Sequence, residues 1–136
     1  MMNRDIRRVA RQEDYAGPEF RDLNIWLPEL FRLTLLRTRT NVLRDMTFHN
    51  CMLEGPAVMV ALGGVQLEAC NVGDSRGDMR NLLLRPLSAD TVTGAIAFEN
   101  CRFVDCDFYA VGFTGPETFL QELLLIPTPA AAESPA

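Results

Sequence analysis

The sequence predicts a small, mainly-β protein with a short helix at each end. Apolar residues return every five positions through much of the chain, and all four cysteines sit in one sequence frame. The middle of the chain also lacks the 3.6-residue period of an amphipathic helix. With 136 residues, 48% of them hydrophobic and 23% charged, the chain has the length and composition of one globular domain. We expect that domain to cover residues 1–126.

Residues 3–14 are expected to form a short amphipathic helix. Asn3 can accept a hydrogen bond from the first free backbone donors, and three apolar residues then recur at helical spacing: Ile6, Val9 and Ala10. Gly17-Pro18 ends this pattern. We therefore interpret residues 1–17 as an N-terminal helical cap.

The cysteines mark an internal repeat. Each one follows an apolar residue by three positions and precedes another by two, as Cys51 does between Phe48 and Leu53. The same outline surrounds Cys70, Cys101 and Cys106, and recurs with Leu23 and Met46 in the cysteine position. Repetition of this kind is stronger evidence about the fold than any single-residue motif.

A five-residue step runs through the same segments. Its two clearest runs are Phe98, Phe103, Phe108, Phe113 and Leu43, Phe48, Leu53, Val58. An apolar centre with a small or thiol residue two positions before it resembles the pentapeptide-repeat family, over roughly residues 20–72 and 95–113. The resemblance implies a short right-handed parallel β-helix, or β-solenoid, with one repeat on each side of a square coil. It also implies that the four phenylalanines fill one coil, with Cys101, Cys106 and Val111 beside them.

The spacing between repeats predicts how the coils of residues 18–113 stack. Phe48 and Leu67 are 19 residues apart, close to one coil, so we expect Cys51 and Cys70 to stack about 4.8 Å apart. The next repeat, at Phe98, follows Leu67 by 31 residues, eleven more than one coil needs. We expect the polar segment 73–80, which contains two glycines, to form a loop that takes up this excess. Three charged residues of that loop are candidates for contact with a partner: Asp74, Arg76 and Asp78.

The end of the domain is expected to be helical over residues 114–126. Pro116 and Glu117 suit a first turn, and four residues then form one apolar face: Phe119, Leu120, Leu123 and Leu124. This face either covers the end of its own coils or pairs with a second copy to make a homodimer. Residues 127–136 are expected to be a disordered tail.

Charge and hydropathy limit the compartments and partners. No apolar run approaches the ~20 residues that cross a bilayer, and Met1 is followed by charged residues rather than a signal core. We therefore expect a cytoplasmic protein without membrane contact, whose cysteines are buried thiols. The net charge is −5, the sum of +3 in residues 1–44 and −8 in residues 45–136. The acidic larger segment argues against nucleic acid as a partner.

Two short patterns suggest catalysis but lack its context. Gly73-Asp74-Ser75-Arg76-Gly77 matches a nucleophile elbow, yet the single histidine, His49, precedes the serine, and a hydrolase of that class needs a longer chain. His49 and Cys51 are close in sequence but should face apart in the repeat. Cys101 and Cys106 supply only two ligands, too few for a tetrahedral metal site. We expect no catalytic, metal or cofactor site.

The function that remains is a non-enzymatic structural or interaction module, binding another protein or a second copy of itself. The first alternative is an acidic DNA mimic that inhibits a topoisomerase or another DNA-binding protein. It depends on five outward carboxylates: Glu54, Glu68, Glu99, Asp105 and Asp107. The second alternative is a small hydrolase that uses Ser75.

Overall fold

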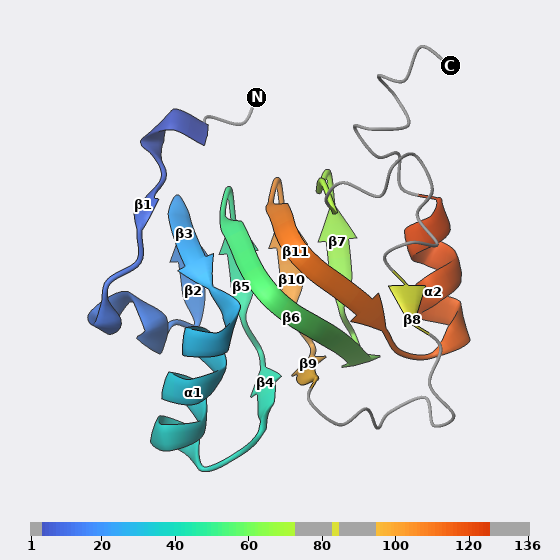
Figure 1. The fold of residues 1–136 in the computed structure, drawn as a ribbon, viewed down its shortest axis with the longest axis horizontal. Helices are drawn as coiled ribbons and strands as arrows, with labels where there is room; N and C mark the ends of the chain where they lie inside the picture. Colours follow the sequence, from blue (N-terminus) through green and yellow to red (C-terminus); the bar gives the residue numbers. More distant parts are fainter. Residues whose placement is uncertain (1–3, 73–82, 85–94, 126–136) are drawn as a thin grey trace.

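The protein consists mainly of β-strands arranged in two parallel sheets, with one α-helix toward each end of the stack of strands (Figure 1). The computed structural model describes residues 4–72, 83–84 and 95–125. All pairings between described strands are parallel, which confirms the predicted mainly-β class.

The smaller sheet has four strands of three residues each. Their order is β2 (Glu19–Arg21), β5 (Thr47–His49), β10 (Arg102–Val104) and β7 (Gln66–Glu68). The central residues align in one inward row: Phe20, Phe48, Phe103 and Leu67. The rings of Phe20 and Phe48 stack with centroids 4.6 Å apart, and those of Phe48 and Phe103 with centroids 4.7 Å apart. Parallel strands in register thus build a continuous aromatic column.

The larger sheet has seven strands. Its main path runs β1 (Arg8–Val9), β3 (Leu23–Trp26), β6 (Met52–Gly63), β11 (Asp107–Thr114) and β8 (Leu83–Leu84). The C-terminal half of β6 also pairs with β9 (Ile96–Glu99), which pairs in turn with β4 (Val42–Arg44). The core, one continuous cluster of buried side chains, includes the inward residues of both sheets.

The chain passes between the sheets through residues with left-handed backbone conformation. Asp22, Asn50, Asp105 and Ala69 occupy one corner, with φ between 51° and 60°. Short polar side chains tolerate this conformation because they bond locally. The Asn50 side chain donates to Asp22 Oδ1 at 2.8 Å. At a second corner Asn100 donates to Asp45 Oδ1 at 2.7 Å, so aligned corners also bind one another.

The order of strands in space differs from the predicted order. Phe103 lies between Phe48 and Leu67, so Cys51 and Cys70 are not neighbours and Cys106 stands between them. The prediction that Cys51 stacks on Cys70 is therefore wrong. It assumed that consecutive repeats stack consecutively, whereas the C-terminal repeats insert between two earlier ones.

The five-residue step also shifts by one residue in β6. Between Glu54 and Ala57 the strand bulges against Tyr109 and Val111, and Met59 rather than Val58 pairs with Phe113. Met59 is fully buried and Val58 only half-buried. The five-residue step places Val58 at a repeat centre, which the resemblance implies to face inward. The bulge adds one residue to the strand and puts Met59 in that position instead.

The predicted N-terminal helix over residues 3–14 is absent from the described part of that segment. Two short 3-10 turns, η1 (Arg4–Ile6) and η2 (Gln12–Ala16), flank strand β1 instead. The backbone N–H groups of Arg8 and Ala10 donate to carbonyls of Asp22 and Asn24, which draws the segment onto the sheet edge. Ile6 and Val9 are exposed, so no apolar helix face is buried there.

A helix that we did not predict, α1 (Leu27–Thr38), interrupts the repeats instead. Leu27, Leu30 and Thr34 recur at helical spacing and are buried against β3, β4 and β6. The predicted C-terminal helix is present as α2 (Glu117–Leu124), preceded by Pro116. The two helices lie toward opposite ends of the stack (Figure 1).

Candidate functional site

The predicted contact face on α2 is mostly buried within its own chain. Phe119, Leu120 and Leu123 are at most 8% exposed and belong to the core, and Leu124 is half-buried against it. Of the two alternatives for this face, packing on its own chain matches the burial, and a free surface for a second copy does not. The other predicted contact residues, Asp74, Arg76 and Asp78, lie outside the described residues, as does Ser75.

The cysteines form part of the core. All four are free and buried, and Cys106 lies in one row between Cys51 and Cys70. Their thiols donate to backbone carbonyls, as Cys106 Sγ does to Phe48 O at 3.4 Å. The neighbouring thiols of Cys51 and Cys70, together with burial, raise the pKa of Cys106, and burial raises the pKa of Cys101 to about 11. Such protonated thiols behave as small apolar side chains.

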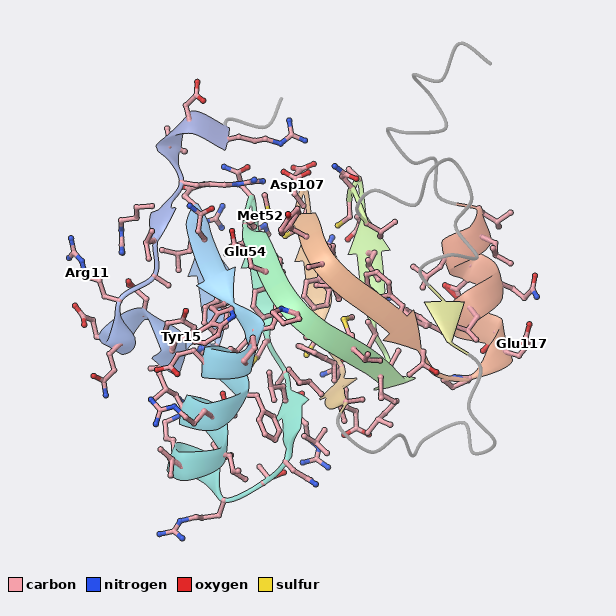
Figure 2. The ribbon with its side chains drawn as sticks, in the orientation of Figure 1. Arg11, Tyr15, Met52, Glu54, Asp107 and Glu117 are labelled. Carbon is pink, nitrogen blue, oxygen red and sulfur yellow. The ribbon has the colours of Figure 1, made fainter. Side chains whose placement is uncertain are left out.

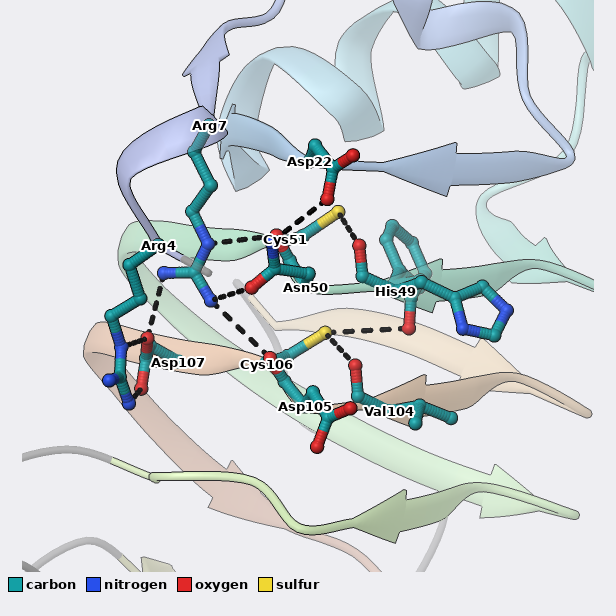
Figure 3. Close-up of polar contacts among 11 residues, drawn as sticks. Arg4, Arg7, Asp22, His49, Asn50, Cys51, Val104, Asp105, Cys106 and Asp107 are labelled. Atoms are coloured by element: carbon teal, nitrogen blue, oxygen red, sulfur yellow. Dashed lines mark hydrogen bonds and ion pairs between the residues drawn. The ribbon is translucent and has the colours of Figure 1, made fainter. Parts of the chain in front are cut away.

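The two residues of the suspected thiol–imidazole pair point apart. Cys51 Sγ donates to the backbone oxygen of His49 at 3.3 Å. The His49 ring points away from this thiol, on the other side of the β5 backbone (Figure 3). Across the described residues, no group of three or more histidine, cysteine or acidic side chains is placed to hold a metal ion.

Three of the five outward carboxylates are matched by arginines. Glu68 pairs with Arg102, and Glu99 pairs with Arg44 at 2.6 Å. Asp107 is buried between Arg4 and Arg7. These pairs reduce the negative field that a DNA mimic needs.

Arg7 and Asp107 form a buried connection between the N-terminal segment and the start of β11 (Figure 3). Their side chains are only 4% and 5% exposed, and Arg7 also donates to Asn50 O at 2.8 Å. Burial opposes ionisation of Asp107, but hydrogen bonds from Arg4 and Arg7 outweigh it and hold the pKa of the carboxyl below its ordinary value. The pair secures the N-terminal segment over β11.

The outward face of β1, β3, β6 and β11 differs in character from the other surfaces. Ile25, Leu53 and Phe108 point inward along these strands, so their neighbours point outward. Val9, Asn24, Met52 and Asp107 make one outward row, and Trp26, Glu54 and Tyr109 make the next. Figure 2 shows Met52, Glu54 and Asp107 on this face. We call Trp26, Glu54 and Tyr109 the aromatic row.

The aromatic row holds the two most exposed aromatic side chains. Trp26 is 50% and Tyr109 66% exposed, while the other aromatic residues, all among those the structure describes, are buried or half-buried. A buried Tyr15 hydroxyl accepts a hydrogen bond from the Trp26 backbone N–H at 3.1 Å, which fixes the backbone there. Exposed aromatic residues held on a rigid strand suit recognition of a partner.

Sequence reasoning did not find this row. Trp26 and Tyr109 each follow an inward apolar residue, Ile25 and Phe108, by one position. A large aromatic residue at an outward position of the repeat was therefore a visible signal. The predicted contact residues lay elsewhere, on the C-terminal helix and in the 73–80 loop.

A pocket of about 270 Å³, with a mostly apolar lining, lies between α1 and β4. Its charged lining residues are already engaged, since Arg44 binds Glu99 and Asp45 accepts from Asn100. The hydroxyl of Thr34 is buried there without a hydrogen-bond partner in the described structure. The lining contains no nucleophile paired with a base, so it offers no catalytic constellation.

Comparison with known proteins supplies no further assignment: the sequence matches no family model, and neither curated proteins nor solved structures yielded a similar chain. The resemblance to pentapeptide repeats therefore stays a prediction. Neither α1 nor α2, the helices of the described chain, has the length and apolar character needed to cross a membrane.

Proposed function

We propose that the protein is a non-catalytic interaction module that binds a protein partner through the outward face of β1, β3, β6 and β11. The observation that carries this proposal is the aromatic row, where Trp26 and Tyr109 are exposed on either side of Glu54. Trp and Tyr are concentrated at the centres of protein interfaces, where they bury much area at low entropic cost.

The scaffold of this module is proposed to be a short right-handed parallel β-helix of the pentapeptide-repeat kind. Parallel strands, an inward phenylalanine column and two sets of aligned left-handed corners support it. Such a scaffold holds its outward rows at fixed strand spacing, so a binding surface needs little ordering when a partner arrives.

The opposite sheet makes a weaker candidate surface. Apart from Val104, its outward residues are polar or charged, among them Glu19, Thr47, Arg102 and Gln66. Arg102 is already paired with Glu68. Paired charges and small polar groups are typical of a solvated surface.

Site-directed photo-crosslinking tests the proposal. The photoreactive residue p-benzoylphenylalanine replaces Tyr109 in the full chain, and a matched protein carries it at Gln66 on the opposite sheet. We expect a defined adduct from position 109 that disappears when Trp26→Ala is added, and none from position 66. The same adducts from both positions, or none from position 109, would contradict the proposal.

A further inference from the structure

Glu54 lies between two exposed aromatic side chains on adjacent parallel strands. Trp26 on β3 and Tyr109 on β11 each pair in register with Glu54, which lies on β6 between them. Neighbouring strands are ~4.8 Å apart, so the two aromatic residues are separated by roughly 9.6 Å. The side chains of Trp26 and Tyr109 thus start one strand away on either side of Glu54, close enough for a ring to reach a cation held by that carboxylate.

The charge of Glu54 is available to a ligand. Glu54 is exposed, and the described part of the chain contains no hydrogen bond or ion pair to its carboxylate. Glu68 and Glu99 differ, because each already has an arginine. An anion flanked by two aromatic side chains can attract a cation by its charge and by their rings together.

The backbone beneath the row is rigid. Each of the three residues ends a run of strand pairing: Trp26 precedes α1, Glu54 precedes the Gly55-Pro56 bulge, and Tyr109 precedes Ala110 with φ of 58°. A Cβ on Gly55 would lie 2.0 Å from Ala110 O, so the two corners are in close contact. Close packing of this kind preorganises the side chains that it carries.

From this geometry we infer that the aromatic row is a binding site for an arginine side chain of a protein partner, with the guanidinium over Glu54 and between Trp26 and Tyr109. The inference deepens the proposed function and rests on it. A planar guanidinium bonds a carboxylate with two parallel N–H groups while its faces stack on aromatic rings. A lysine ammonium lacks the planar faces and is more strongly hydrated.

A second copy of this chain fits the row less well. A twofold contact centred on the row sets the same residues against each other, which places Glu54 opposite Glu54. Like charges at such a contact are repulsive. The occupant is therefore assigned to a different protein.

Peptide binding to the full chain tests the inference, because Trp26 is the single tryptophan and reports directly on the site. The probes are the peptides Gly-Ser-X-Ser-Gly, where X is arginine, lysine or citrulline, the last being a neutral analogue of arginine. We expect a saturable change in Trp26 fluorescence with the arginine peptide, weaker binding of lysine and none of citrulline. Glu54→Gln should weaken arginine binding by about tenfold, and Tyr109→Ala should also weaken it.

Matched variants separate binding from folding. Glu19→Gln removes an exposed carboxylate on the opposite sheet and should leave binding unchanged, and Tyr109→Phe should retain it because the ring remains. Thermal unfolding of each variant checks that the fold persists. Equal binding of citrulline or lysine, no saturable change with arginine, or a dimer abolished by Glu54→Gln would overturn the inference. A Trp26-dependent adduct at position 109 without arginine selectivity would overturn it while leaving the proposed function intact.

Discussion

The Arg7 guanidinium lies 2.7 Å from Asp107 Oδ2, and the two residues are one hundred positions apart in the chain. Both side chains are nearly inaccessible to solvent. A buried charge that loses its partner costs much more than an exposed one, because water cannot replace the lost contact. This pair therefore makes stability depend on the N-terminal segment.

Asp107→Asn should lower the free energy of unfolding by about 3–5 kcal/mol, because Arg7 then stays buried without its carboxylate. Urea denaturation followed by fluorescence measures the change. Arg8→Gln is the matched control, since Arg8 pairs with Asp14 at 2.7 Å but is half exposed, and its loss should change stability far less than Asp107→Asn. Equal effects of the two substitutions would show that burial does not strengthen the Asp107 contact.

Acid should weaken the protein through Asp107. Its pKa is lowered on folding, so its stabilising contribution is complete above the unfolded value of about 3.9 and is lost as the pH falls through the folded value. Hydrogen bonds from Arg8 and from the Arg11 backbone also lower the pKa of Asp14 to about 2. The urea midpoint of the native protein should fall steeply below about pH 4, and that of Asp107→Asn less steeply. If the urea midpoints of the two proteins fell equally with pH, Asp107 would not be the source of the acid sensitivity.

Ala69→Gly should stabilise the protein by roughly 0.5–1 kcal/mol. Ala69 has φ of 54° without the side-chain bond that Asn50 makes at the same corner, and glycine adopts this conformation without steric cost. Ala97→Gly, in the extended strand β9, should be destabilising. Calorimetric melting of both variants gives the comparison, and a lower melting temperature for Ala69→Gly would refute the strain at this corner.

The four thiols should resist modification in the folded protein. All four are buried, and at pH 8 a pKa of about 11 leaves roughly one Cys101 side chain in a thousand as thiolate. Hydrogen bonding with Cys106 lowers the pKa of Cys51 and of Cys70, so burial is what protects those two thiols. Ellman's reagent should therefore react slowly with the native protein and rapidly with four thiols in denaturant. A Gln66→Cys variant, with an exposed extra thiol, should give one fast equivalent. Fast reaction of the unmodified chain would mean that the core opens readily.

Local repetition predicted the inside of this protein well. The cysteine frame and the step from Phe98 to Phe113 anticipated buried thiols and buried rings, and the structure confirms both. Each inward position depends on residues only a few places away, so the pattern is legible in the sequence. The bulge at Gly55-Pro56 is an exception, because it lies against Ala110, far along the chain, and the local pattern does not show that contact.

Long-range arrangement could not be read in the same way. Nothing local to Phe48 or Leu67 specifies that Phe103 separates them. The helix over Leu27–Thr38 was not predicted, because it lies within residues 20–72, the segment that the repeat resemblance covered. The aromatic row likewise joins residues of three distant strands, and only the register brings Trp26, Glu54 and Tyr109 together.

The position of β10 between β5 and β7 has a consequence for synthesis on the ribosome. The first two thirds of the chain leave a gap one strand wide, which only the segment after Ile96 fills. The nascent protein must hold unpaired strand edges until its last third emerges, a state that favours recruitment of chaperones and slows final closure. A truncation before β9 should consequently accumulate as aggregate rather than as a smaller folded unit.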